Sequence, residues 1–393
     1  MTVQDKTITF VIPWYGKDLL GGAESQCRNT VEHLAKIGVN VEVFTTCSKS
    51  FHDSWSDYYP SGIEKINNIT VHRFPTDIRD EKLFDSINFK ILNKMPITYD
   101  EEIQYIKNSI NSSSLIKQIT NDQDFRIFVF LPYLYGTTYC GCNASPKNSI
   151  LIPCLHDEGY AYFQIFKELF PKIRGMIFNS TPEEELAKTI FPTLSKHITV
   201  GEGVTPFSYG NSNLQKKFKF DNYILYVGKK DKNKNVHVLV NYFCKYIKRN
   251  KTDLHLILTG PGEITIPKDY KQYVHSFLLS NQDLYSAYCN ALVTCQPSLN
   301  ESFSLVIMES WLCNTPVLVH EKCTVTNDHC SKSNGGLYFS NYHEFEECVN
   351  FFLTNPEKRQ LMGVKGQKYV NENFQWDAII KKYLNFIDSC KLN

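Results

Sequence analysis

Apolar residues along this chain gather in short runs that alternate with segments of helical periodicity. Residues 7–16 form a β-rich apolar run that ends in proline and glycine. Helical spacing follows over residues 21–38, where Gly38 takes the position just beyond the helix end, and residues 39–46 read as the next strand. A strand, a Gly-rich loop, a helix and a strand in this order predict a βαβ unit.

The same alternation continues along the chain and restarts after one polar stretch. Further strands are predicted at 69–75, 125–132, 149–158, 175–181, 197–203, 222–230, 253–262, 292–298 and 315–320. Residues 80–118 are polar and mostly helical in pattern, and residues 342–390 are helical. The polar, weakly periodic residues 203–221 predict a linker. Two α/β domains with parallel sheets, each of Rossmann type, are therefore expected.

Composition places the chain among ordinary soluble proteins. Its 393 residues favour two or three domains, and 42% of them are hydrophobic. The 42 Lys and Arg residues nearly cancel the 41 Asp and Glu residues, so net charge does not indicate nucleic acid or an acidic membrane surface. The apolar run at residues 8–12 is too short for a signal peptide, and no run approaches the roughly 18 residues of a membrane span. A cytoplasmic protein is expected, with peripheral membrane contact left open.

Thirteen cysteines are scattered without the spacing of a disulfide framework, which favours a reducing compartment. Cys140 and Cys142, with Cys154 and His156 downstream, come nearest to a metal motif. Their spacing does not match a zinc site, so buried small hydrophobes are the favoured interpretation and no metal is expected.

Glycines stand at two predicted strand ends. Gly21 and Gly22 lie between a strand and a helix, where backbone N–H groups can approach an anion at the helix N-terminus. Gly260 and Gly262 follow another strand and suit close approach to a base or phosphate. A tight turn explains each pair equally well, and both interpretations stay open.

Four lysines crowd the loop that follows the strand ending at Gly228. A strand's carboxyl end is where doubly wound folds bind ligands, and cations there would neutralise a pyrophosphate. This function is predicted for Lys229 and Lys234. Lys230 and Lys232 are interpreted as a solvated charge run.

Residues 300–310, NESFSLVIMES, place a carboxylate on each side of an apolar run. Ser302 or Ser304 can cap a helix there, and the first N–H groups of that helix suit a phosphate. Glu309 follows Glu301 by about 12 Å at helical rise, which matches a sugar at one end of a pyrophosphate and a ribose at the other. Carboxylates suit vicinal hydroxyls because they accept several hydrogen bonds. The simpler alternative is a capped, half-buried helix with acidic ends.

His156 follows a strand of the first domain and precedes Asp157 and Glu158. Histidine is the usual acid or base near neutral pH, so a catalytic role is possible by position. A structural histidine is an equally good interpretation.

These segments resemble family 4 glycosyltransferases, the large retaining group with the GT-B fold. The resemblance is carried by residues 13–46, 226–236, 256–263, 297–319 and 355–383. Residues 297–319 hold its most specific part, the E-x₇-E element formed by Glu301 and Glu309. Residues 75–125 match nothing in the family pattern.

The resemblance implies a role for each matching residue. Glu301 would bind the donor sugar and Glu309 the ribose, while His156 would lie near the anomeric centre. Lys229, in the family's arginine position, and Lys234 would bind the diphosphate. The implied contacts to the nucleotide come from Gly21, Gly22, Gly228 and Gly260 and from the backbone amides of Phe303, Ser304 and Leu305. Lys229 replaces a bidentate guanidinium with a point charge, and Ser304 and Asn314 stand where the family usually has glycine.

The resemblance therefore implies an α/β GT-B fold with two Rossmann-like domains facing a central crevice. Residues 1–203 would form the acceptor domain, with helix 377–393 packing back on it, and residues 204–376 the donor domain. The implied reaction moves a hexose, glucose as first choice, from a UDP-sugar to a hydroxyl of a glycan or lipid-linked acceptor, with retention and without a metal. Loops near 14–24 and 77–115 would bind the acceptor, as in polysaccharide biosynthesis.

Two other functions remain open from the residues alone. A sugar-nucleotide epimerase or hydrolase shares the two-domain fold. A non-catalytic nucleotide-sugar-binding subunit of a transferase complex would also fit, because Lys229 departs from the family's arginine.

Overall fold

The computed structural model describes residues 6–19, 21–207, 220 and 222–390, which form two compact units. The first unit is assigned residues 1–203 and 376–393, and the second residues 204–375. Most of the predicted linker, at 208–219 and 221, lies outside the described residues.

The first unit is built on an eight-stranded sheet with the order β3-β4-β2-β1-β5-β6-β7-β8. Only β3 runs antiparallel to its neighbour; the other pairs are parallel. The strands are β1 (Thr7–Val11), β2 (Val41–Thr46), β3 (Gly62–Ile66), β4 (Ile69–Phe74), β5 (Arg126–Phe130), β6 (Ser149–Leu151), β7 (Gly175–Phe178) and β8 (His197–Thr199).

The edge strand β3 was not predicted from the sequence. Four of its five residues are exposed and only Ile66 is buried, so it lacks the apolar run that marks the other strands. Asn67 and Asn68 join it to β4 with φ angles of 49° and 66°. Asparagine tolerates this left-handed conformation, which a two-residue hairpin turn requires.

Helices of the first unit are α1 (Gly22–Lys36), α2 (Glu81–Leu92), α3 (Tyr99–Lys107), α4 (Ser113–Asp122), α5 (Gly136–Ala144), α6 (Gln164–Leu169), α7 (Thr181–Ile190) and α15 (Trp376–Ser389). Helix α1 ends as predicted, because Gly38 adopts a φ of 81° just beyond it. The helical prediction for 80–118 is confirmed by α2, α3 and α4, whose first turns are capped by Asp80, Thr98 and Ser112.

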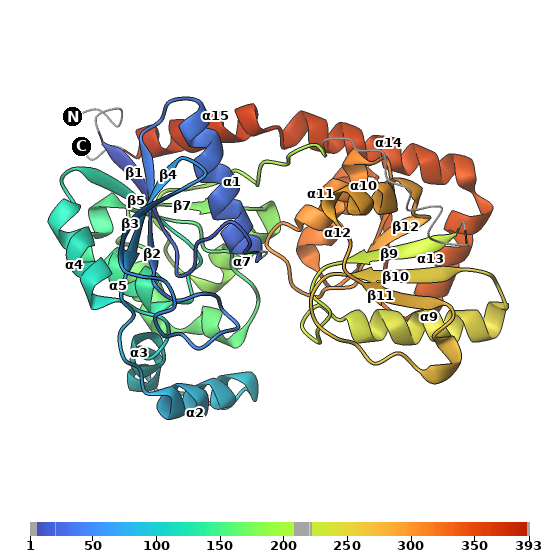
Figure 1. The fold of residues 1–393 in the computed structure, drawn as a ribbon, viewed down its shortest axis with the longest axis horizontal. Coiled ribbons are helices and arrows are strands. Elements are labelled where there is room, and N and C mark those ends of the chain that lie inside the picture. The colour runs from blue at the N-terminus through green and yellow to red at the C-terminus, as the bar shows by residue number, and fades with distance from the viewer. Residues whose placement is uncertain (1–5, 20, 208–219, 221, 391–393) are drawn as a thin grey trace. The chain divides into compact units, whose positions relative to one another are not determined.

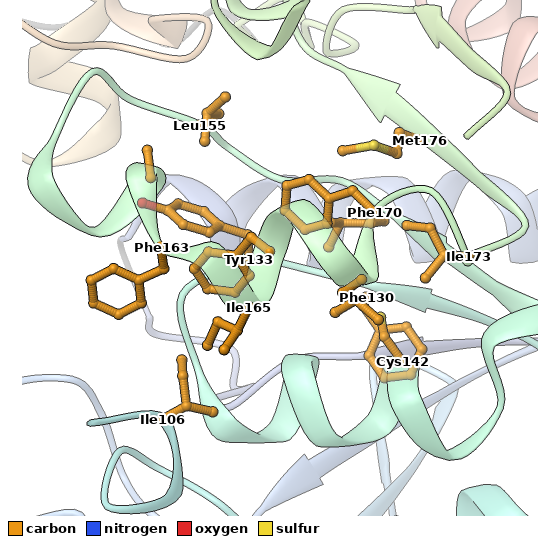
Figure 2. Packing of buried hydrophobic residues seen from close by; sticks show 14 of the residues in the cluster. Ile106, Phe130, Tyr133, Cys142, Leu155, Phe163, Ile165, Phe170, Ile173 and Met176 are labelled. Carbon is orange, nitrogen blue, oxygen red and sulfur yellow. The ribbon is translucent and has the colours of Figure 1, made fainter. Parts of the chain in front are cut away.

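One large apolar cluster of the first unit joins the sheet to helices α2 to α7. Its members include Phe128 and Phe130 of β5 and the helix residues Ile119 and Phe166, all fully buried. Figure 2 shows part of this cluster, with Phe130 among side chains contributed by several elements. Burial of this apolar area is the main stabilising contribution to such a core.

The second unit has a six-stranded, fully parallel sheet with the order β11-β10-β9-β12-β13-β14. The strands are β9 (Tyr223–Val227), β10 (His255–Thr259), β11 (Val274–Phe277), β12 (Val293–Gln296), β13 (Val317–His320) and β14 (Gly336–Phe339). Strands β11 and β14 were not predicted. Both hold partly exposed residues, as expected for the two edges of a sheet.

Alternate residues of β9 and β10 face opposite sides of this sheet. Ile224 and Leu256 join the cluster under α9 (Val236–Asn250) and α13 (Tyr342–Thr354), whereas Leu225 and Ile257 join the cluster under α10 (Asn281–Asn290). Figure 1 shows helices on both faces of this sheet. A sheet covered on both faces explains why its strands read as continuous apolar runs.

The remaining helices of the second unit are α11 (Leu305–Leu312), α12 (Thr324–Ser333) and α14 (Pro356–Asn373). Helix α14 lies so close to α11 that a Cβ at Gly366 would fall 2.0 Å from the Trp311 ring, and one at Gly363 would fall 1.8 Å from the Asn314 carbonyl oxygen. Glycine at both positions is therefore a packing requirement.

Helix α15, at the end of the chain, belongs to the first unit. Its Trp376 ring stacks on His33 of α1 with centroids 3.9 Å apart, and a Cβ at Gly203 would clash with the same ring at 2.3 Å. Among the described residues, no helix combines the length and apolarity that crossing a membrane requires.

Candidate functional site

The predicted donor-binding residues gather where the chain of the second unit changes direction across its sheet. Strands β9 and β12 are neighbours, but the chain leads from β9 to β10 and β11 on one side and from β12 to β13 and β14 on the other. Loops at the carboxyl ends of such strands diverge and leave a place for a ligand. The loop after β9 carries the lysines, and the loop after β12 carries Glu301.

A salt bridge joins these two loops. The Lys234 Nζ lies 2.7 Å from Glu301 Oε1, and the side chains are 36% and 11% exposed. Burial opposes the charge on Lys234, but the Glu301 carboxylate favours it, and the pKa of Lys234 is raised above its ordinary value. Asn235, which the sequence analysis did not single out, donates from Nδ2 to the Pro297 carbonyl at 3.1 Å and ties the loops a second time.

Lys229 has a different partner from Lys234. Its Nζ lies 3.0 Å from Asp231 Oδ2, while Asp231 Oδ1 accepts a hydrogen bond of 2.9 Å from the Lys234 backbone N–H. Burial would raise the pKa of Asp231, but this N–H group and the two lysines hold it below its ordinary value. Asp231 was missed in the sequence, where the only signal is an acidic residue within a run of lysines.

The interpretation of Lys230 as a solvated charge is wrong. Its side chain is buried, and its ammonium donates to Ser276 Oγ at 3.0 Å. Burial lowers the pKa of Lys230. Lys232 is exposed, in agreement with the prediction for that residue.

Gly228 and Gly260 bring the loops after β9 and β10 into contact. Their φ angles are 141° and 133°, and a Cβ at Gly260 would lie 2.1 Å from the Gly228 carbonyl oxygen. The Gly228 N–H donates to Thr259 O at 2.9 Å. Close approach of the two backbones therefore explains these glycines without a ligand.

Ser304 begins helix α11 in a strained conformation, with φ 75° and ψ 76°. The predicted cap by its side chain is wrong, because the hydroxyl makes no hydrogen bond to the first turn. The Ser304 Oγ is buried and has no hydrogen-bond partner among the described residues. A buried hydroxyl in this state costs about 1–3 kcal/mol.

Two further polar atoms near the end of β12 are also buried without a hydrogen-bond partner among the residues described. Gln296 Oε1 and Ser298 Oγ have no hydrogen-bond partner within the part of the chain that the structure describes. Together with Ser304 they place three such atoms in the segment that leads from β12 into α11. Unsatisfied groups are rare in native cores, and their gathering here is what a ligand or water site would produce.

Glu309 lies on the second turn of α11 and accepts a hydrogen bond of 2.9 Å from the buried Tyr288 hydroxyl of α10. Burial raises the pKa of Glu309 to about 7, although the bond from Tyr288 lowers it. Phe303 is buried, with its ring edge-on to His329 and Phe374. Because the Phe303 side chain is buried, this residue can contact a ligand only through its backbone. Leu305 is half-buried.

Gly21 and Gly22 start helix α1 of the first unit. A Cβ at Gly21 would overlap the Glu24 carboxylate at 1.9 Å, whereas a Cβ at Gly22 would meet no described atom within 4 Å. The Glu24 carboxylate is the far end of a flexible side chain, so this contact by itself does not require glycine at position 21. Gly22 is exposed, and its surroundings leave room for a larger group.

A buried polar network holds the segment that leads to His156. Glu183 accepts from the Leu155 N–H and from the Asn179 N–H, each at 2.6 Å, and so joins the ends of β6 and β7. Asn179 in turn exchanges side-chain hydrogen bonds of 2.6 and 3.2 Å with Gln26 of α1. The network links the helix that begins at Gly22 to the loop that carries His156. None of its members was predicted, because they are spread over more than 150 residues.

Comparisons with known proteins agree with this architecture. Residues 211–369 match the family model for glycosyl transferases group 1. An uncharacterized glycosyltransferase of Methanocaldococcus jannaschii is 24% identical over 231 residues, which cover 53% of this chain and 55% of that protein. This chain thus spans about half the length of the curated relative.

Solved structures are similar over nearly the whole chain. Sucrose-phosphate synthase from Thermosynechococcus elongatus has a TM-score of 0.70 at 16% identity, covering 97% of this chain and 98% of the other. HepE of Anabaena, in complex with UDP and glucose, has a TM-score of 0.69 at 12% identity, covering 98% and 100%. At these identities the likeness shows the fold. The chain has the two parallel-sheet domains of the GT-B fold, and residues 211–369 are similar to the glycosyl transferases group 1 model.

Proposed function

We propose that this protein is a retaining glycosyltransferase of family 4 that moves a hexose, glucose as first choice, from a UDP-sugar to a hydroxyl of a glycan or lipid-linked acceptor. The second unit would bind the donor and the first unit the acceptor. The proposal rests first on one observation, the salt bridge of Lys234 with Glu301 at the point where the loops of the second sheet diverge.

This pair suits a sugar diphosphate because its two members have complementary tasks. An ammonium group has three N–H donors, and one contact to Glu301 leaves others for phosphate oxygens. Glu301 offers further acceptor sites for sugar hydroxyls. Lys229 would contribute a second positive charge, held in place by Asp231.

Departure of the nucleoside diphosphate is the step that these groups would assist. Negative charge develops on the leaving phosphate, and Lys234, Lys229 and the amides of Phe303, Ser304 and Leu305 would stabilise it. In a front-face substitution, the bond from the anomeric carbon to the phosphate oxygen breaks as the acceptor oxygen bonds the same face. The leaving phosphate takes the acceptor proton. With cations and amides in these roles, we propose that the reaction needs no metal.

Glu309 and the first unit complete the proposal. Glu309 would bind the ribose hydroxyls while Tyr288 holds its carboxyl group. Gly22 would let the first-unit loop approach the diphosphate, with Gly21, Gly228 and Gly260 shaping the loops. His156, positioned through Leu155, would lie near the anomeric centre.

A thermal-shift measurement with nucleotides tests the donor class. A ligand at a hundredfold excess over its Kd stabilises the folded state by about 2.7 kcal/mol. UDP and UDP-glucose are expected to raise the melting temperature, whereas GDP and ADP are not. Stabilisation by GDP or ADP alone would contradict the choice of UDP.

Turnover measurements test the reaction itself. Lys234→Ala and Glu301→Ala are expected to lose sugar transfer while keeping the folded state. Lys232→Ala, at an exposed position of the loop that carries Lys234, is the control and is expected to keep sugar transfer. The anomeric configuration of the product, followed by proton NMR, tests retention. Release of free sugar at the transfer rate without acceptor would favour a hydrolase, and UDP binding without turnover would favour a binding subunit.

A further inference from the structure

The first unit has its own place where the loops diverge, and aromatic residues line it. Strand β1 pairs with β2 and β5, and the chain leads from β1 to β2 on one side and from β5 to β6 on the other. Trp14 follows β1 and Tyr135 follows β5, and their rings meet edge-on with centroids 5.0 Å apart. Ligands of doubly wound folds bind at this position, outside the carboxyl ends of the strands.

A third loop, residues 49–59 between β2 and β3, adds further aromatic rings to the same place. We name it the aromatic loop. Phe51 and Trp55 each lie 5.8 Å from the Trp14 ring, and the Trp14 Nε1 donates to Ser48 Oγ at 3.1 Å. The Trp55 Nε1 donates to the Phe51 carbonyl at 3.0 Å, which fixes the shape of the loop.

Two rings of the aromatic loop are open to solvent. The side chains of Phe51 and Tyr58 are 47% and 64% exposed, although neighbouring Trp14 is buried. Exposed aromatic surface beside a sheet's carboxyl edge is a feature of binding sites more than of plain surface. A ring face carries negative partial charge, and it attracts the C–H groups that line one face of a pyranose.

Three cations beside these rings already have partners. Arg73 pairs with Glu64 and donates to the Tyr15 carbonyl at 2.9 Å. Arg79 lies 3.4 Å from Glu81 and over the Trp55 ring. Lys49 lies 3.9 Å from Asp53, and its ammonium stands over one face of the Tyr58 ring, 5.0 Å from the ring centroid, so a sugar would use the other face. A sugar phosphate needs positive charge that is available to it, whereas a neutral sugar needs an apolar face.

We infer that the aromatic loop, with Phe51 and Tyr58, is a binding platform for an unphosphorylated glycan. In the proposed function, on which this part of the inference rests, that glycan is the acceptor. The platform selects against the sugar phosphates that phosphate synthases of the same fold are named for.

Glycan binding by the whole chain, without any donor, tests the platform directly. The probes are arrays of neutral oligosaccharides and of sugar phosphates, read with Phe51→Ala and Tyr58→Ala variants. Each variant is expected to bind neutral glycan at least tenfold more weakly, and Phe51→Tyr and Tyr58→Phe, which keep the rings, are expected to bind normally. Ile63→Ala is the matched control, because Ile63 is 70% exposed on β3 of the same unit.

Three outcomes would overturn the inference. The first is that no neutral glycan binds, and the second is that glycan binding survives both alanine substitutions. The third is preferential binding of sugar phosphates; loss of that binding in Lys17→Ala would assign it to the exposed Lys17. UDP stabilisation is expected to be equal in all variants, since the platform lies in the other unit. Glycan binding without UDP binding would refute the proposed function and leave the platform standing. UDP binding without glycan binding would refute the platform and leave the proposed donor class standing.

Discussion

Replacing Ser304 by glycine is expected to stabilise the second unit, although the residue stands at a helix start. Its φ of 75° costs a non-glycine residue ~1–2 kcal/mol. The buried hydroxyl without a partner costs a further ~1–3 kcal/mol. Glycine removes both costs but loses ~0.5–1 kcal/mol to the greater entropy of the unfolded chain. The net gain in free energy of unfolding is therefore about 1–4.5 kcal/mol.

Ser304→Ala separates the two contributions. Alanine keeps the backbone strain and removes only the hydroxyl, so it is expected to stabilise by about 1 kcal/mol or more. Serine at a helix start usually stabilises the helix through its side chain, but the Ser304 hydroxyl makes no such bond and its removal carries no capping penalty. The difference between Ser304→Gly and Ser304→Ala therefore measures the relieved strain less the entropy cost of glycine, about 0–1.5 kcal/mol.

Thermal unfolding together with hydrogen exchange of peptides that span α11 provides the assay. A gain of 1 kcal/mol corresponds to ~2–4 °C for a unit of this size. Hydrogen exchange assigns the change to the second unit, because a chain of two units need not unfold in one step. Asn334→Gly is the control, since Asn334 is exposed at a φ of 51° and asparagine tolerates that conformation.

The result that refutes this reasoning is a lower stability for Ser304→Gly than for the unchanged protein, or a glycine variant that is less stable than the alanine variant. A second measurement concerns the ligand. If the protein keeps the strained serine for the diphosphate, both variants bind UDP about fivefold more weakly, the loss of roughly 1 kcal/mol from one hydrogen bond. Unchanged UDP affinity would leave the strain without a functional reason.

The remaining predictions concern pH and packing. The pKa of Glu309 is raised to about 7 by burial, so the folded state binds more protons than the unfolded state above pH ~4.5, and stability falls as pH rises from ~4.5 to about 7. Glu309→Gln keeps the acceptor for Tyr288, and its unfolding measured across this range is expected to lose that slope; an unchanged slope would contradict the assignment. Gly366→Ala is expected to lower the free energy of unfolding, measured with denaturant, by more than ~2 kcal/mol, because the added Cβ meets the Trp311 ring. Gly22→Ala is the control and is expected to leave this free energy nearly unchanged. Equal effects of the two substitutions would refute the packing argument. Glu183→Gln turns an NH₂ group toward a backbone N–H and is expected to lower the free energy of unfolding by ~1–3 kcal/mol in the same measurement. A smaller decrease would mean that the segments after β6 and β7 hold together without Glu183.

Much of the fold follows from local patterns. Apolar runs located the central strands, because strands buried on both faces must be apolar throughout. Helical spacing located α1, α2 to α4 and α13 to α15, whereas α5, α6 and α12 were not singled out. Gly38 marked the end of α1, since glycine adopts the left-handed conformation there at little cost. The edge strands β3, β11 and β14 were not predicted, because edges are partly exposed and their side chains carry little of the apolar signal.

The general location of the donor site was also accessible from the sequence. In a parallel sheet all strands end at the same edge, so the lysine loop and the segment around Glu301 had to lie on that edge. The choice between the lysines was not accessible. Lys234 meets Glu301 across 67 positions of sequence, while Lys230 of the same loop is buried against Ser276.

The sequence by itself determined the two α/β units and the loops in which polar residues lie, because periodicity and strand ends are local properties. Only the tertiary structure decided which side chains meet. Glu183, Asn179 and Gln26 form one network because strand order brings α1, β6 and β7 together, and hydrophobic pattern does not encode strand order. The Ser304 hydroxyl looks like an ordinary helix cap in the sequence. In the structure its backbone is left-handed, and the hydroxyl is buried without a hydrogen-bond partner among the described residues.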